Sequence, residues 1–284
     1  MCLKNQHKRT IRKIKNSVKR LMDATKYPYR RVIHPRRFQA YCLGTAKSGT
    51  HSIAGLFGQH YRVAHEPEGE FLAETVVLTE GQVNFYAQQK MILARDQRLW
   101  LELESSMLTY HYMEILLKTF PQAKFILTIR DCYSWLDSLI NHQLGEWSSI
   151  SWQMLRDVHY RQPDDVYAPA EQILHEHGLY TLDGYLSYWA THNQHVLDTI
   201  PADRLLVVPT KQITAYLPQL ADFLSIPPTT LISDKSHLYK AKEKFGILTQ
   251  IDHNFLEQKV NQHCRTLMDA YFPEMRNLHE TIKE

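Results

Sequence analysis

A glycine-bounded loop with one lysine is the first stretch of the sequence that could do chemistry. It reads GTAKSGTHS over residues 44–52 and directly follows the apolar run AYCL. A nucleotide-phosphate loop of the form G-x-x-x-x-G-K-[ST] places its lysine after the second glycine. Here Gly44 and Gly49 keep the glycine spacing, but Lys47 lies inside the loop and Thr50 takes the usual lysine position. Backbone N–H groups at a helix N-terminus bind anions, so the loop predicts an anion site with Lys47 as a mobile charge. Hydroxyl donors are added by Ser48, Thr50 and Ser52.

An arginine at the end of a second apolar run could bind the same kind of ligand. The segment KFILTIRDCYSWLDS covers residues 124–138, so Arg130 ends the run and Ser138 follows eight residues later. Parallel sheets bind ligands beyond the carboxyl ends of their strands, and the guanidinium fork matches a phosphate group. Two alternatives stay open: a structural ion pair of Arg130 with Asp131 or Asp137, and an ordinary strand-to-helix turn for the glycine loop.

The elements that must position these residues alternate between short β-rich runs and longer helical patterns. This alternation from Phe38 onward indicates an α/β fold, a single domain over residues 38–284 with a central, mainly parallel sheet flanked by helices. The expected strands are 40–43, 61–65, 99–103, 124–129 and 204–208. The expected helices are 49–58, 82–96, 106–119 and 132–143, with a further helical group over about 150–200.

The basic charge of the chain is concentrated at its N-terminus. Residues 1–37 carry 13 Lys and Arg and one acidic residue, whereas the remainder carries 20 basic and 29 acidic residues. Apolar residues recur there at helical spacing, which predicts a basic amphipathic helix as an N-terminal extension. We expect it to dock on its own domain or on a second subunit; contact with an anionic surface and disorder are the alternatives.

Cysteine usage and hydropathy indicate a cytoplasmic protein. The four cysteines are scattered and form no C-x-x-C pair, so we expect neither a disulfide framework nor a thiolate metal site. No apolar run approaches the roughly 20 residues that span a bilayer, and the basic N-terminus lacks the apolar core of a signal peptide.

The loop and the strand-end arginine together resemble the sulfotransferase family that uses 3′-phosphoadenosine 5′-phosphosulfate (PAPS). In that family a K-S-G-T loop after the first strand grips the 5′-phosphosulfate, which here corresponds to Lys47, Ser48, Gly49 and Thr50. An arginine at a strand end and a serine eight residues later bind the 3′-phosphate; they correspond to Arg130 and Ser138. The resemblance covers most of residues 38–227. It implies a P-loop-like sulfotransferase fold, PAPS as co-substrate, 3′-phosphoadenosine 5′-phosphate (PAP) as product and no required metal.

The chain departs from its cytosolic steroid and phenol relatives around the nucleotide. Ser52 stands where those enzymes have a tryptophan, so the resemblance leaves the adenine contact unassigned. His51 replaces the second of two threonines; we include His51 and Ser52 among the cofactor-binding residues and His51 among the catalytic candidates. The stretch 208–213, VPTKQI, also departs from the family pattern. The stretch 240–246 is expected either as a loop over the nucleotide or as a solvated charge run.

The resemblance also points to a general base. Cytosolic members take a histidine from a K-T-H stretch after the third strand, but no histidine occurs at the comparable place, 102–106. Carbohydrate-type and tyrosyl-protein sulfotransferases use a glutamate near the end of the second strand, often followed by proline, which corresponds to Glu66. Glu66 is the predicted base and Glu104 the reserve, while an ion pair of Glu66 with Lys47 or Arg130 is the structural alternative. If the strand continues through Glu66, His65 is expected on the opposite strand face from it.

The predicted function is transfer of the sulfuryl group of PAPS to a hydroxyl or amine of a small polar metabolite, saccharide or natural product. A P-loop nucleotide kinase is the first alternative, but it would need lysine at Thr50 and a strand-end aspartate for magnesium. A non-catalytic adaptor that uses residues 1–37 to bind nucleic acid or membranes is the second. We expect no nucleic-acid partner, and the sequence sets no oligomeric state.

Overall fold

A five-stranded parallel sheet forms the centre of the protein. The computed structural model describes residues 33–79, 84–163, 166–235 and 243–275. The strands are β1 (Ala40–Cys42), β2 (Val63–His65), β3 (Leu103–Ser105), β4 (Lys124–Ile129) and β5 (Leu205–Pro209), in the order β2-β3-β1-β4-β5. The helices are α3 (Thr50–Phe57), α4 (Gly69–Leu78), α5 (Phe85–Leu99), α6 (Met113–Thr119), α7 (Cys132–Gly145), α8 (Ile150–Tyr160), α9 (Gln172–Glu176), α10 (Leu182–Thr199), α11 (Leu217–Phe223), α12 (His253–His263) and α13 (Arg265–Tyr271).

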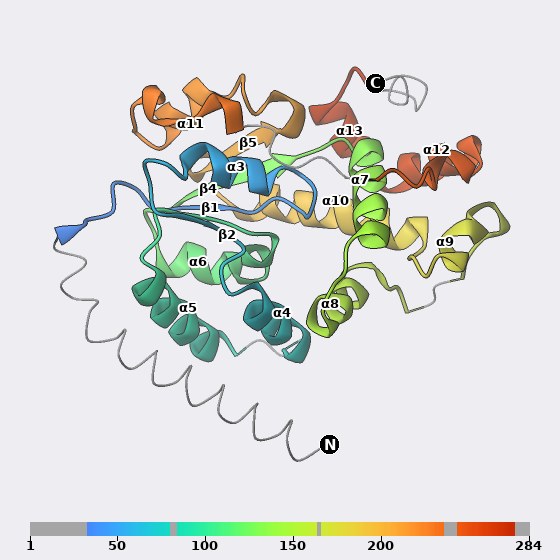
Figure 1. Cartoon of the computed structure of the whole chain (residues 1–284), viewed down its shortest axis with the longest axis horizontal. Coiled ribbons are helices and arrows are strands. Elements are labelled where there is room, and N and C mark those ends of the chain that lie inside the picture. The colour runs from blue at the N-terminus through green and yellow to red at the C-terminus, as the bar shows by residue number, and fades with distance from the viewer. Residues whose placement is uncertain (1–32, 80–83, 164–165, 236–242, 276–284) are drawn as a thin grey trace, which may run out of the picture.

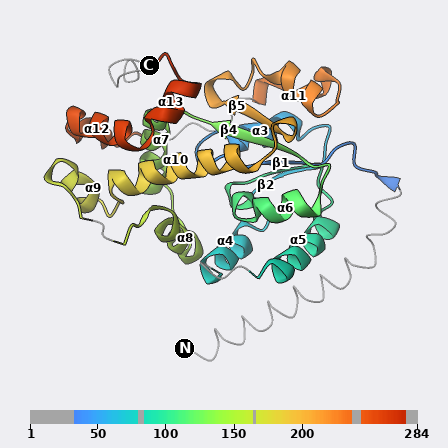
Figure 2. The ribbon, with the colours of Figure 1, turned by 180° about the vertical axis from the view of Figure 1, so that it is seen from behind.

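Helices cover both faces of the sheet (Figure 1), because strand side chains alternate between the faces and both faces are apolar. Ala40 and Cys42 of β1 belong to a core with α3 and α11. Tyr41 points the other way, into a core with α4, α5 and α6. The long helix α10 lies against β4 (Figure 2), and its aromatic residues join α7, α12 and α13 in a third core. The carboxyl ends of the strands therefore meet helices α3 and α7, which follow β1 and β4.

The expected α/β class and parallel sheet are confirmed, and β4 has the expected bounds. The expected strand over 99–103 is wrong. Helix α5 continues to Leu99, Trp100 ends it with a left-handed φ of 51°, and β3 begins only at Leu103. A helix end and a strand here share one apolar run, which periodicity alone does not divide. The sequence reading also missed α4, α12 and α13.

Most of the expected N-terminal extension lies outside the described residues, as do residues 240–242 of the expected nucleotide loop. The last two residues of the extension pack onto the domain. Arg37 donates to the buried Glu102 at 2.9 Å, and Arg36 pairs with Asp96 at 2.6 Å. Among the described helices, none is long and apolar enough to cross a membrane.

Candidate active site

The glycine loop after β1 opens helix α3 toward a cavity of about 430 Å³ at the carboxyl edge of the sheet. Lys47 and Gly49 adopt left-handed φ angles of 65° and 102°. A Cβ on Gly49 would lie 2.9 Å from Ile213, so both conformation and space favour glycine there. Because α3 begins at Thr50, its N-terminal turn faces this cavity, which is the arrangement of an anion site. The loop residues that line the cavity are Ala46, Lys47, Gly49, Thr50, His51 and Ser52.

Ser48 behaves differently from the rest of the loop. Its hydroxyl is buried, donates to the Thr45 carbonyl oxygen at 2.7 Å and lies 3.0 Å from Thr128 Oγ1. The side chain therefore joins the loop to β4, and the expected contact of this hydroxyl with the ligand stays a prediction. Gly44 allows the loop to lie this close to β4, because a Cβ at that position would lie 1.9 Å from Thr128 Oγ1.

Side chains from α7 and α10 hold the backbone that surrounds the cavity. The indole N–H of Trp135 donates to the Ala46 carbonyl oxygen at 2.8 Å, and that of Trp189 donates to the Arg130 carbonyl oxygen at 3.0 Å. His192 Nε2 lies 2.7 Å from the Leu43 carbonyl oxygen and donates to it. All three side chains are buried, so the loop and the strand end are fixed by the core.

Arg130 and Ser138 both line the same cavity as the loop. Arg130 Nε donates to Ser134 Oγ at 2.9 Å, and Nη1 donates to the Lys47 carbonyl oxygen at 3.2 Å. Among the described residues no carboxylate forms an ion pair with Arg130, and Asp131 instead caps α7 by accepting from the Ser134 backbone N–H at 2.8 Å. The guanidinium charge thus faces the cavity, and burial lowers the pKa of Arg130.

Glu66 reaches this cavity because β2 ends one residue before it. The Glu66 backbone takes a left-handed φ of 46°, and its N–H donates to the Ser105 carbonyl oxygen at 3.0 Å. The strand thus ends at His65, so the condition for placing the two residues on opposite faces is not met, and His65 and Glu66 line the same cavity. Burial raises the pKa of the Glu66 carboxyl to about 7. Within the described ranges no cation pairs with Glu66, so the alternative ion pairs with Lys47 and Arg130 are not formed.

Burial shifts the neighbouring nitrogen bases as well. It lowers the pKa of Lys47 to about 8, with the charge of Arg130 adding to the effect. It lowers the pKa of His65 to about 4, with His51 adding to it. His65 is therefore neutral at pH 7; its Nε2 lies 3.2 Å from Thr50 Oγ1, and its ring lies 4.7 Å from the His51 ring.

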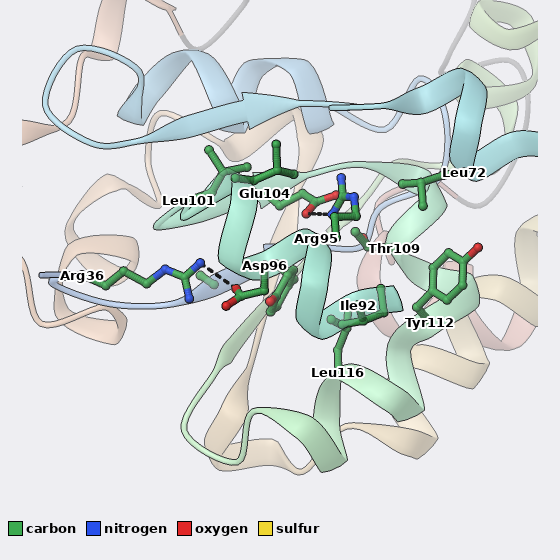
Figure 3. Close-up of a pocket in the computed structure, with 13 residues that line it drawn as sticks. Arg36, Leu72, Ile92, Arg95, Asp96, Leu101, Glu104, Thr109, Tyr112 and Leu116 are labelled. Atoms are coloured by element: carbon green, nitrogen blue, oxygen red, sulfur yellow. Dashed lines mark hydrogen bonds and ion pairs between the residues drawn. The ribbon is translucent and has the colours of Figure 1, made fainter. Parts of the chain in front are cut away.

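The turn that carries Glu66 is held from the far side by Arg95 of α5. Arg95 Nη2 donates to the Pro67 carbonyl oxygen at 2.7 Å, and Nε lies 3.2 Å from the Glu68 carboxylate. Figure 3 shows Arg95 and Glu104 pointing toward one another, and the two form a buried ion pair. Their cavity, of about 20 Å³, holds no more than one water and is separate from the site. Glu104 is thus a partner of Arg95, and its expected role as reserve base is wrong.

A second cavity, of about 310 Å³, adjoins the first between α4, α7 and α8. Ala46, Glu66 and His142 line both cavities. His142 was missed by the sequence reading. It lies on α7 ten residues after Cys132, and burial lowers its pKa to about 4, with Lys47 adding to the effect. Two groups that can accept a proton thus lie where the cavities join: the partly ionised Glu66 carboxyl and the neutral His142 ring.

Two residues after β5 complete the first cavity. Thr210 donates to the Ile129 carbonyl oxygen at 3.0 Å and also to the Ser48 carbonyl oxygen, which ties the loop to the end of β4. Lys211 adds a further cation to the lining. Their position directly after a parallel strand could have indicated that they line the site. They were not predicted to do so, because the stretch VPTKQI departs from the family pattern.

The chain is similar to known sulfotransferases. A family model described as a sulfotransferase domain matches residues 39–230. Among solved structures, a sulfotransferase from Mycobacterium avium is 13% identical, with 88% of this chain and 81% of that chain covered and a TM-score of 0.46. The sulfotransferase domain of an olefin synthase from Synechococcus PCC 7002 is 17% identical, with 77% and 82% covered and a TM-score of 0.36. A sulfotransferase domain from the curacin biosynthetic pathway is 12% identical, with 79% and 96% covered and a TM-score of 0.33. No curated protein matches the sequence.

Proposed function

Because the chain belongs to the sulfotransferase family, we propose that it moves the sulfuryl group of PAPS to a hydroxyl or amine of a small polar metabolite, saccharide or natural product. The first cavity takes the donor and the second takes the acceptor. The observation that carries the proposal is Glu66, the carboxylate that lines both cavities and has a pKa raised by burial.

The donor assignment is supported by the distribution of positive charge. The N-terminal turn of α3 and Lys47 lie on one side of the first cavity and would hold the 5′-phosphosulfate through backbone N–H groups and the ammonium. Arg130 and Ser138 come from the end of β4 and from α7, and would hold the 3′-phosphate. Such a 3′-phosphate contact would separate PAPS from ATP. His51 and Ser52 complete the donor wall, and His51 also faces the transferred group in this arrangement.

The chemistry assigned to Glu66 is proton removal from the acceptor. As the acceptor oxygen or nitrogen bonds to sulfur, the bond between sulfur and the 5′-phosphate oxygen of PAPS breaks. The acceptor proton passes to the Glu66 carboxylate, and the leaving phosphate keeps the electron pair, stabilised by Lys47. A base with a pKa near the working pH is efficient at such a transfer. No step in this scheme requires a metal, and no group of three or more metal-ligating side chains occurs among the described residues.

Thermal denaturation of the full chain with nucleotides tests the proposal. PAP should raise the Tm in a concentration-dependent way, whereas ATP with magnesium should raise it much less. Incubation with PAPS and a mixture of hydroxylated and amino compounds should give products heavier by one sulfuryl group in mass spectrometry. Equal stabilisation by ATP with magnesium would contradict the donor assignment and favour a phosphate-transfer enzyme.

A further inference from the structure

The cavity assigned to the acceptor contains a cation that no carboxylate of the described residues balances. Arg156 of α8 is half-buried and lines this cavity beside His142 and His159. Within the described part of the chain it forms no hydrogen bond or ion pair. Burial lowers the pKa of His142 to about 4 and that of His159 well below its ordinary value, so both rings are neutral at pH 7. Arg156 therefore supplies the positive charge of this cavity.

Neither of the two carboxylates that line the cavity pairs with Arg156 among the described residues. Glu70 lies in the first turn of α4, where the helix N-terminus stabilises a negative charge. Its oxygens accept from Ser149 Oγ at 2.7 and 2.9 Å. Glu66 lies at the junction with the donor cavity. The guanidinium group of Arg156 can therefore bind an anion through two parallel hydrogen bonds, as guanidinium groups bind carboxylate, phosphate and sulfate.

Two tryptophans line the same cavity. Trp152 of α8 is packed closely over α4, since a Cβ on Gly69 would lie 3.0 Å from its ring. Trp147 precedes α8 and is 88% exposed, at the edge of the cavity. Indole faces stack on aromatic rings and on the apolar faces of sugar rings. The cavity thus combines two indole rings, one cation and a base.

We propose that the acceptor is a ring-bearing organic acid. Its hydroxyl or amine lies at Glu66, its ring lies against Trp152 and Trp147, and its carboxylate, phosphate or sulfate group pairs with Arg156. This inference rests on the proposed function, because it takes the second cavity as the acceptor site. The volume of about 310 Å³ suits a single substituted ring.

Titration calorimetry of the full chain saturated with PAP tests the inference with matched pairs that differ in charge. The probes are 4-hydroxyphenylacetate against 4-hydroxyphenylacetamide, and glucuronate against glucuronamide. In at least one pair the acid should bind about tenfold or more tightly than the amide. Arg156→Gln should abolish that preference and weaken acid binding about tenfold to a hundredfold, while Arg156→Lys should keep part of it.

Arg161→Gln is the matched control. Arg161 directly follows the last residue of α8, is exposed and pairs with Asp157 at 2.8 Å. It should leave the acid preference unchanged. The inference is overturned if acid and amide bind equally, if Arg156→Gln leaves acid binding unchanged, or if neither acid binds. PAP binding is measured on each variant. If PAP does not bind to the unaltered chain, the donor assignment fails, and titration of the same pairs without PAP still decides the acid preference.

Discussion

The Arg95 guanidinium donates to the Pro67 carbonyl oxygen at 2.7 Å, so a buried cation on α5 holds the turn that presents Glu66. The same group pairs with Glu104, the middle residue of β3, and lies 3.2 Å from the Glu68 carboxylate. Arg95 thus joins the residues on the C-terminal side of Glu66 to the central sheet. It does not line the donor or acceptor cavity, and it acts as a positioning residue.

The first prediction concerns this positioning. Removing Arg95 alone would leave a buried carboxylate without its partner, which is strongly destabilising, so the test is the double variant Arg95→Met with Glu104→Gln. We expect kcat to fall about tenfold or more, because small displacements of a catalytic group are costly. The rise in Tm caused by PAP should be unchanged, since the donor cavity lies on the other side of the turn.

Arg36→Met is the matched control for that experiment. Arg36 lines the same small cavity as Arg95 (Figure 3) but pairs with Asp96 and does not contact residues 66–68. It should lower stability with little effect on kcat. A similar fall in kcat for both variants, or loss of the PAP effect in the double variant, would show that Arg95 acts on stability alone.

This arrangement illustrates what the sequence could predict. The parallel sheet and the loop with Gly44, Gly49 and Lys47 were predictable, because hydrophobic alternation and glycine spacing are local signals. The convergence of Glu66 with Lys47 was expected only through the family resemblance. The left-handed turn at Glu66 was not predictable from periodicity, and neither was the face on which Glu104 lies. Arg95 contacts both the turn after Glu66 and Glu104, but it lies elsewhere in the sequence. His142 was missed because its place in the site comes from the packing of α7 against the loop.

The second prediction is the pH dependence of turnover. A base must be ionised, so kcat/KM should rise as pH increases through about 7, where Glu66 loses its proton. It should fall again above about pH 8, as Lys47 loses the charge that stabilises the leaving phosphate. Glu66→Gln should lower kcat about a hundredfold or more and remove the acidic limb. An acidic limb that persists in the residual activity would assign that limb to another group.

The third prediction is the effect of Glu66 on stability. Its folded-state pKa lies above the ordinary value of 4.5, so the folded state holds the proton more tightly, and the ionised form disfavours folding as pH rises toward 7. Glu66→Gln should therefore raise the free energy of unfolding by about 1–3 kcal/mol at pH 8 and have little effect at pH 4. Glu74→Gln, at an exposed position on α4, is the control and should show no such difference. Equal effects of Glu66→Gln on the free energy of unfolding at both pH values would contradict a buried carboxyl group with a raised pKa.

The fourth prediction concerns recognition of the 3′-phosphate. PAP should bind more tightly than AMP, which lacks that group, and the ratio of the two Kd values measures the contact. Arg130→Met should reduce the ratio about tenfold or more, and Ser138→Ala should reduce it by a smaller factor, because a charged, two-point contact of arginine with phosphate is stronger than one hydrogen bond from a neutral hydroxyl. A ratio unchanged in both variants would move the 3′-phosphate to another part of the cavity.

The fifth prediction uses two glycines with positive φ. Gly49 has φ 102° and a Cβ there would lie 2.9 Å from Ile213 and 3.1 Å from Thr210, so Gly49→Ala must displace the loop or the segment after β5. Gly178 has φ 65° with nothing within 4 Å of the added Cβ, so Gly178→Ala carries only the backbone cost of about 1 kcal/mol. Titration calorimetry with PAP separates the two effects. Gly49→Ala should weaken PAP binding at least tenfold, since the N–H groups of the α3 N-terminus would no longer converge on one point. Gly178→Ala should bind PAP as tightly as the unaltered chain. If Gly49→Ala also binds PAP normally, the anion site does not depend on the loop conformation, and the phosphosulfate must be held by side chains alone.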